Sequence, residues 1–137
     1  MLTSSSTGTI WYVDRTSFRP ETPSIKIIVG TPVFLFAWST QHKCHRYLAS
    51  LKKYSLPEGG LFQFLVCPHY FCECLLYFSL AVVGAPEGQL FNRTLVCAVI
   101  FIAVNLGVTA NGTREWYIEK FGREKVEGRW RMIPFVF

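Results

Sequence analysis

The sequence predicts an all-α protein: a multi-pass bundle of about three membrane helices, followed by a C-terminal segment at the membrane interface. Of the 137 residues, 50% are hydrophobic and only 17% are charged, and the mean hydropathy is +0.26. That composition is more apolar than is usual for a small soluble domain. Three apolar runs, at residues 27–40, 62–84 and 94–110, approach the roughly 17–25 residues that a spanning helix needs. A soluble chain of buried core helices remains the alternative.

The chain divides into two parts. Residues 1–26 are mostly polar and contain Pro20 and Pro23, which is typical of a tether or of the stub of a longer protein. Residues 1–9 are rich in serine and threonine and show neither the basic start nor the apolar stretch of a cleavable signal peptide. Residues 27–137 are expected to form one membrane domain. The five cysteines lie mostly in apolar runs, which does not suit a secreted disulfide framework.

The first run, 27–40, is short and contains Pro32. It is expected to continue as a helix to about Lys53, because residues 41–53 contain neither glycine nor proline. On that helix a mostly polar stripe forms at helical spacing. Its members are Gln41, His45, Leu48 and Lys52. The Leu-Pro-Glu-Gly-Gly segment at residues 56–60 breaks the helix.

The second run, 62–84, is long enough to span a bilayer, and Pro68 is expected to bend it. It holds Glu73, with His69 one helical turn earlier on the same face. Ionisable groups at bilayer depth are costly and usually mark function. Two interpretations stay open. The two side chains tie helices together, or they form a site for a polar ligand group such as an amide.

The third run, 94–110, carries no charge, and residues 111–112 are expected to form a turn with Thr113 as the N-cap of a further helix. The loop before the second run has four basic residues against Glu58, and the tail has six against four acidic ones. The connector at 85–93 has only Glu87 and Arg93. The positive-inside rule therefore places the first loop and the C-terminus in the cytosol.

Metal and nucleic-acid partners are not expected. His42, Cys44 and His45 suggest a metal site, but on one helix they point to different sides, and no paired Cys-x-x-Cys set completes a tetrahedron. No Gly-rich phosphate fingerprint is present.

Basic and aromatic residues recur on the segments predicted to be cytosolic. They are Lys52, Tyr54, Arg114, Tyr117 and Arg129. One interpretation is that they anchor the protein at the interface. The other is that they form a rim for the phosphates of a dinucleotide, since arginine makes bidentate phosphate contacts, with the nicotinamide inside.

Several segments together resemble the C-terminal catalytic domain of the steroid 5α-reductase family, from about residue 27 to the end. They are Gln41-His42-Lys43-Cys44-His45, residues 51–53, 56–62 and 67–73, Trp116-Tyr117, and Arg129 with residues 133–137. The His-Lys-Cys-His element looks most like the polyprenal (polyprenol) reductase branch, especially its fungal members.

The resemblance implies a multi-pass reductase of the endoplasmic reticulum membrane that uses NADPH. Its lipid substrate would be polyprenal, reduced at the α-isoprene double bond to dolichal on the way to dolichol for protein N-glycosylation. The alternatives are a steroid or enoyl-type reductase relative, an isoprenylcysteine-type membrane methyltransferase, and a non-catalytic truncated fragment.

The resemblance also implies a cofactor-binding set. Its members are Gln41, His45, Lys52, Tyr54, His69, Glu73, Tyr117 and Arg129. Lys52 stands where the family often has a phosphate-binding arginine, and His69 replaces its usual asparagine. The acid pair that polarises the substrate carbonyl lies in N-terminal helices of the family, which nothing before residue 27 matches. No catalytic residue is therefore assigned, and the chain is expected to be the cofactor-binding C-terminal part.

Overall fold

A computed structural model describes residues 24–137, and these residues are mostly helical. The elements are α1 (Ile25–Ser50), η2 (Gly60–Gln63), α2 (Pro68–Val83), α3 (Arg93–Phe121) and η3 (Arg123–Lys125), the two η elements being short 3-10 helices. Among the described residues no strand forms, only an isolated parallel bridge between Leu65 and Trp130. The predicted helical class is confirmed. The predicted polar tether lies almost entirely outside the described residues.

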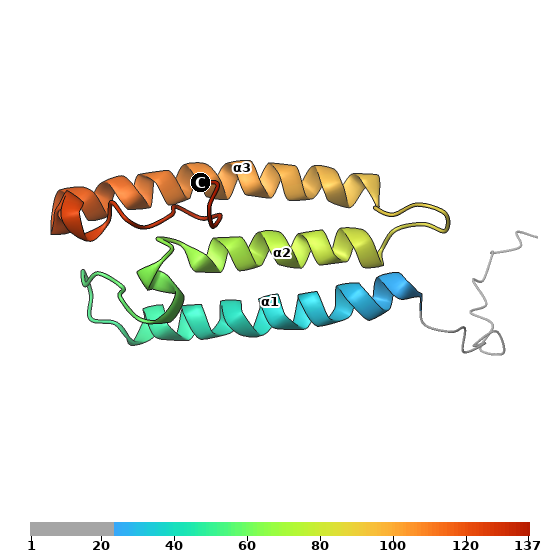
Figure 1. Ribbon diagram of the computed structural model, residues 1–137, viewed down its shortest axis with the longest axis horizontal. Helices are drawn as coiled ribbons and strands as arrows, with labels where there is room; N and C mark the ends of the chain where they lie inside the picture. The colour runs from blue at the N-terminus through green and yellow to red at the C-terminus, as the bar shows by residue number, and fades with distance from the viewer. Residues whose placement is uncertain (1–23) are drawn as a thin grey trace, which may run out of the picture.

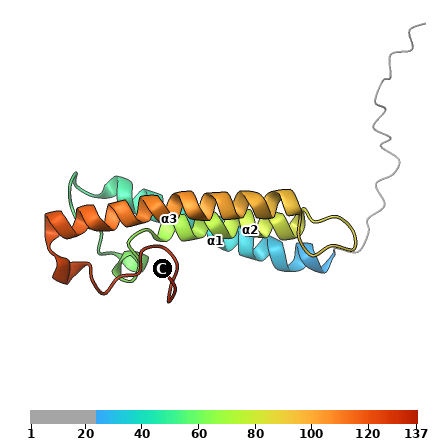
Figure 2. The ribbon, with the colours of Figure 1, turned by 90° about the horizontal axis from the view of Figure 1, so that it is seen from above.

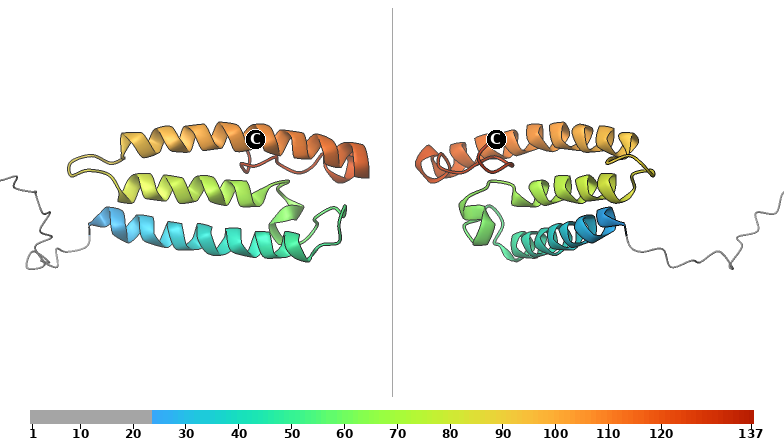
Figure 3. Two further views of the ribbon diagram at one scale, coloured as in Figure 1. Left: turned by 180° about the vertical axis from the view of Figure 1, so that it is seen from behind. Right: turned by 45° about the vertical axis from the view of Figure 1, so that its right-hand side comes forward.

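The three long helices lie side by side in an antiparallel row, with α2 between α1 and α3 (Figures 1 and 3). The loop at residues 51–67 and the C-terminal end of α3 meet at one end of the row, whereas the connector at residues 84–92 lies at the other (Figure 1). Both basic segments of the sequence therefore share one end of the bundle.

Small residues bring α1 and α2 together. The buried residues of α1 are Gly30, Ala37 and Cys44, which recur every seven positions along one face. A Cβ atom at Gly30 would lie 2.4 Å from Cγ2 of Val83 on α2. Small residues at this seam let two backbones approach closely, as is common between membrane helices. Pro32 lies inside α1 without ending it.

The start of α2 corrects the expectation of a bend at Pro68. The helix begins at this proline, which occupies its first turn, where a missing backbone N–H costs nothing. The predicted run 62–84 is thus divided into a 3-10 turn, a short irregular link and a helix of 16 residues. At 1.5 Å per residue that helix is about 24 Å long, less than the roughly 30 Å hydrocarbon core of a bilayer.

The turn predicted at residues 111–112, with Thr113 as an N-cap, was wrong. Helix α3 runs through them without a break. Asn111 Nδ2 donates to Oε1 of Glu115 at 2.8 Å, and Thr113 Oγ1 donates to the Thr109 carbonyl at 3.0 Å. Gly112 in a helix interior costs only about 1 kcal/mol relative to alanine, which a 29-residue helix absorbs. The N-cap is Asn92, whose side chain accepts from Leu95 N–H.

One helix of the described region, α3, is long and apolar enough to cross a membrane. Its most apolar stretch has a mean hydropathy of 2.0, and 11% of it is buried. Helix α2 is apolar but shorter, and α1 does not meet the same criteria. The expectation of three crossings is therefore not confirmed. Large apolar side chains nevertheless face outward on both outer helices. They include Phe36, Trp38, Ile100, Phe101, Val104 and Val108.

The tail after α3 folds back onto the start of α2 (Figure 2). Its backbone pairs with the link before α2. Val66 N–H donates to the Trp130 carbonyl at 2.8 Å, and Cys67 N–H donates to the Arg131 carbonyl at 3.0 Å. The tail, which was expected to lie at the membrane interface, thus supplies part of the core at the basic end. The buried residues of that core are Val66, Cys67, Ala110, Val126 and Met132.

Candidate functional site

A polar layer joins α1 to α2. Gln41 Nε2 donates to Oε2 of Glu73 at 2.9 Å. One turn further toward the basic end, the His45 and His69 rings meet edge to face with centroids 5.2 Å apart. Within each helix the two residues are four apart, and because the helices are antiparallel the pairs match turn for turn. The structure thus brings together four of the eight predicted residues.

The layer is only partly shielded from solvent. Gln41, His69 and Glu73 are half-buried and His45 is exposed. The Glu73 carboxylate is bound to the opposite helix, so it links α1 and α2 with or without a ligand. His69 is packed against Tyr70, at a centroid distance of 4.3 Å. Its Nδ1 is buried and has no hydrogen-bond partner within residues 24–137.

A second group of predicted residues surrounds a pocket of about 350 Å³ between the loop after α1 and the end of α3. The predicted residues that line it are Lys52, Tyr54 and Tyr117, joined by Lys53 and Trp116. The Tyr54 ring lies 6.5 Å from that of Trp116. We call it the basic pocket, because it combines lysine ammonium groups with aromatic faces.

Tyr54 is held in an unusual backbone conformation, with φ +67°. A non-glycine residue in this left-handed region costs on the order of 1–3 kcal/mol, and such residues cluster at functional sites. Lys120 Nζ lies 4.2 Å from the centroid of the Tyr54 ring, a cation–π contact that helps to hold the ring in place.

Arg129 supports the wall of this pocket without lining it. Its Nη1 donates to the Pro57 carbonyl at 2.7 Å, and Pro57 lines the pocket. Its Nη2 lies 3.9 Å from Oε1 of Glu58, and the Arg129 side chain is 11% exposed. Arg114, by contrast, is not among the residues lining the pocket.

The two groups are neighbours along α1. Leu48, which lines the basic pocket, follows His45 by three residues on the stripe predicted from the sequence. Lys52 does not continue the helical stripe, because α1 ends at Ser50. The loop after α1 carries Lys52 to the pocket instead.

Sequence reasoning did not include Trp116, Lys120 or Pro57 in the site. Trp116 and Lys120 are four residues apart on α3, and their side chains meet with Lys120 Nζ 5.2 Å from the Trp116 ring. That spacing was readable in the sequence. The role of Pro57 depends on its contact with Arg129, 72 residues away, which no local pattern reports.

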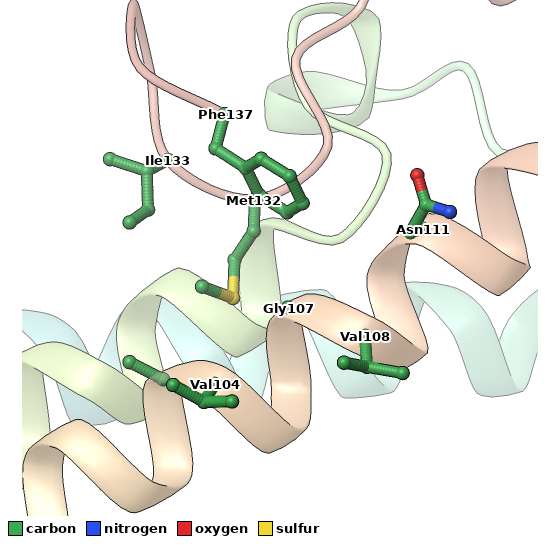
Figure 4. Close-up of a pocket in the computed structure, with 8 residues that line it drawn as sticks. Val104, Gly107, Val108, Asn111, Met132, Ile133 and Phe137 are labelled. Carbon is green, nitrogen blue, oxygen red and sulfur yellow. The ribbon is translucent and has the colours of Figure 1, made fainter.

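A larger pocket of about 510 Å³ lies between α3 and the C-terminal segment (Figure 4). It is mostly apolar and contains none of the predicted residues. Met132 points from the C-terminal segment toward Gly107 and Val104 of α3 (Figure 4). Arg131 Nε donates to Oδ1 of Asn111 at 2.7 Å and fastens the tail to α3.

The His-rich stretch of α1 separates as its helical spacing requires. His42 stacks on Trp38 with centroids 6.3 Å apart, whereas His45 meets α2. In the region that the structure describes, no three His, Cys, Asp or Glu side chains gather as a metal-binding group.

Comparison with known proteins identifies the family. Residues 7–137 match the family described as 3-oxo-5-alpha-steroid 4-dehydrogenase. The polyprenal reductase of Xenopus tropicalis is 34% identical over 120 residues, which are 80% of this chain and 37% of that protein. The Saccharomyces cerevisiae polyprenal reductase is 38% identical over 104 residues, covering 76% of this chain and 38% of the yeast protein.

The chain spans about a third of the length of these relatives. No solved structure gives a significant match. The resemblance predicted from the sequence motifs is confirmed, because the family match covers nearly the whole chain and the relatives include the yeast protein. The chain belongs to the 3-oxo-5-alpha-steroid 4-dehydrogenase (steroid 5α-reductase) family and is similar to its polyprenal reductases.

Proposed function

We propose that this chain is the cofactor-binding part of a membrane-bound, NADPH-dependent polyprenal reductase. The complete enzyme would convert polyprenal to dolichal, on the way to dolichol for protein N-glycosylation. Its relatives carry the name polyprenal reductase. Because the matched region is about a third of their length, the activity is proposed for the whole enzyme and cofactor binding for this chain.

The observation that carries the proposal is the basic aromatic pocket. Lys52 and Lys53 lie on one side of it and Trp116 and Tyr117 on the other. Lysine ammonium groups neutralise phosphates, and aromatic faces stack on nucleotide bases. The residues present therefore fit one end of a phosphorylated dinucleotide, and the polar layer one turn beyond Leu48 offers amide and carboxylate groups for the other.

The chemistry divides between cofactor and protein. Bound NADPH supplies a hydride to the β-carbon of a conjugated enal. Within this chain, the two lysines hold the phosphates and the aromatic rings orient the base. The hydrogen bond from Gln41 fixes the Glu73 carboxylate, and the buried His69 Nδ1, which has no partner among residues 24–137, is the group that we propose binds an amide. We assign no residue of this chain as the acid that polarises the substrate carbonyl.

The proposed setting is the endoplasmic reticulum membrane, with the basic end of the bundle in the cytosol. Four observations support it: the apolar helix α3, the outward-facing apolar side chains, the basic residues gathered at one end, and the lipid nature of the substrate named by the relatives.

Thermal stability with and without nucleotides tests the proposal. A ligand that binds only the folded state stabilises it by about 2.7 kcal/mol at a hundred times its Kd. The detergent-purified chain should gain stability from NADPH and less from NADH, because NADH lacks the 2′-phosphate that the lysines favour. Stabilisation by S-adenosylmethionine instead would favour a methyltransferase. No shift with any of the three would favour a non-catalytic fragment.

A further inference from the structure

A separate pocket of about 530 Å³ lies on a different face of α1, at the basic end of the bundle. One wall is the α1 face that carries Phe36, Lys43 and Tyr47, and the other is the segment of residues 59–62. None of the eight residues predicted for the cofactor site lines it.

Two hydrogen-bond donors in this pocket lack an acceptor. Lys43 is exposed, and no carboxylate of residues 24–137 lies within 4 Å of its ammonium group. Glu58, the acidic residue of the adjoining loop, is paired with Arg129. The Tyr47 hydroxyl accepts from Gly59 N–H at 2.8 Å and from Glu58 N–H at 3.3 Å. Both lone pairs of this oxygen are engaged, so its proton is available to donate.

The two donors, Lys43 and Tyr47, belong to the same helix. Lys43 and Tyr47 are four residues apart, so they lie on the same face of α1, one turn from each other. A positive charge and a hydroxyl donor with no competing carboxylate suit the oxygens of a phosphate group.

Apart from Thr40 and two glycines, the rest of the pocket is lined by apolar side chains, and the pocket is open. Phe36 is 65% exposed and Leu61 42% exposed, whereas Phe62, which also lines the pocket, is buried. Phe36 precedes Lys43 by two turns of α1, so the apolar part lies toward the middle of the bundle and the charge toward its end. This order, apolar inside and cationic at the rim, is that of a membrane interface, where anionic headgroups attract basic side chains.

We infer that this pocket binds an anionic membrane phospholipid. Its phosphate would contact Lys43 and Tyr47, and the first methylenes of an acyl chain would lie against Phe36 and Leu61. A free phosphate would use only the two donors and leave the apolar majority of the pocket uncovered. The inference is independent of the cofactor site, since the two pockets share no lining residue.

Lipid titration of the detergent-purified chain tests the inference. Phosphatidylglycerol and phosphatidylcholine of the same acyl chains are added to the micelles, and binding is followed by thermal stability and by native mass spectrometry. Phosphatidylglycerol should bind more tightly, and Lys43→Gln should weaken its binding about ten-fold, since a charge-assisted contact is lost. Lys43→Arg should retain most of the affinity.

The matched control is Arg46→Gln. Arg46 is exposed, lies three residues from Lys43 and is absent from the pocket, yet its replacement removes the same charge. It should change phosphatidylglycerol binding by no more than about two-fold. Equal losses of phosphatidylglycerol affinity in the two variants would show a diffuse electrostatic attraction and overturn the proposed site.

Two further outcomes would contradict the inference. One is equal binding of the two lipids. The other is an equal, Lys43-dependent stabilisation by glycerol phosphate, which would make the ligand a soluble phosphate. Both readouts use the unliganded chain, so failure of NADPH binding would leave the lipid result unaffected.

Discussion

Glu73 shows how one charged residue is accommodated between two apolar helices. The sequence paired it with His69, one turn away on the same helix. In the structure its partner is Gln41 on α1, and His69 meets His45 instead. Helical periodicity reports which residues share a face of one helix but not which residues of the neighbouring helix they meet.

Replacing Gln41 and Glu73 should separate structure from cofactor binding. Gln41→Leu leaves the carboxylate without its donor, so the free energy of unfolding should fall by about 1–3 kcal/mol. Glu73→Gln keeps a hydrogen-bonding amide opposite Gln41 and should cost less than about 1 kcal/mol, while reducing stabilisation by NADPH. Thermal melts with and without NADPH measure both. An unchanged NADPH shift in Glu73→Gln would make the pair purely structural.

Arg129→Gln should weaken NADPH binding in addition to loosening the loop. The side chain is 11% exposed and contacts Pro57 and Glu58, so its loss should cost about 1.5–3 kcal/mol of stability, the range for hydrogen bonds to charged groups. Because Pro57 lines the basic pocket, the NADPH-induced shift in melting temperature should shrink as well.

The control for Arg129 is Arg123→Gln, which removes the same charge from a side chain that is 71% exposed. It should change stability by less than about 0.5 kcal/mol and leave the NADPH shift intact. A full NADPH shift in Arg129→Gln would sink its assignment to the cofactor site.

At the scale of elements, the seam between α1 and α2 sets the register of the polar layer. Gly30, Ala37 and Cys44 bury the side of α1 that meets α2, and Gln41 and His45 follow on adjoining positions. A change in the distance between α1 and α2 at this seam should therefore shift the polar layer, even though Gly30 is far from that layer along the helix.

Gly30→Ala tests this seam. Its Cβ would lie 2.4 Å from Val83 Cγ2, and a β-branched valine has few alternative rotamers. Overpacking of this kind costs about 1–3 kcal/mol, measurable as a lower midpoint of unfolding in detergent. Val83→Ala in the same chain removes the clash, so the double variant should recover most of the loss. No recovery would show that the helices do not meet at these residues.

Across the whole molecule, charge and hydropathy vary along the bundle axis. The first loop and the tail bring their basic residues to one end, and the connector, with only Glu87 and Arg93, lies at the other (Figure 1). An apolar surface separates the two ends, particularly along α3. This distribution supports the proposal that the chain is embedded in a membrane with its basic end in the cytosol.

Cysteine labelling in sealed microsomes tests that orientation. In a Cys97→Ser background, which removes the one exposed native cysteine of the described residues, Lys125→Cys and Glu87→Cys are each treated with a membrane-impermeant maleimide. The positive-inside rule leads us to expect labelling at position 125 and protection at position 87 until detergent is added. The reverse pattern would invert the topology.

The sequence by itself determined the helical class, the apolar runs, the gathering of basic charge on two segments and the family. Each of these depends on composition, periodicity or local motifs, which neighbouring residues carry. The predictions misplaced the start of α2 and the continuity of α3. In the local sequence, a proline in the first turn of a helix looks the same as one that bends a helix, and a glycine within a long helix looks the same as one in a turn.

Only the tertiary structure decided which polar groups meet. Gln41 and Glu73 are 32 residues apart and Arg129 and Pro57 are 72 apart, and their contacts follow from the antiparallel register of α1 on α2 and from the tail folding back. The small residues of the seam permit that register. The close packing that selects it involves many side chains at once, which is why the sequence alone could name Gln41, Glu73 and Arg129 but not their partners.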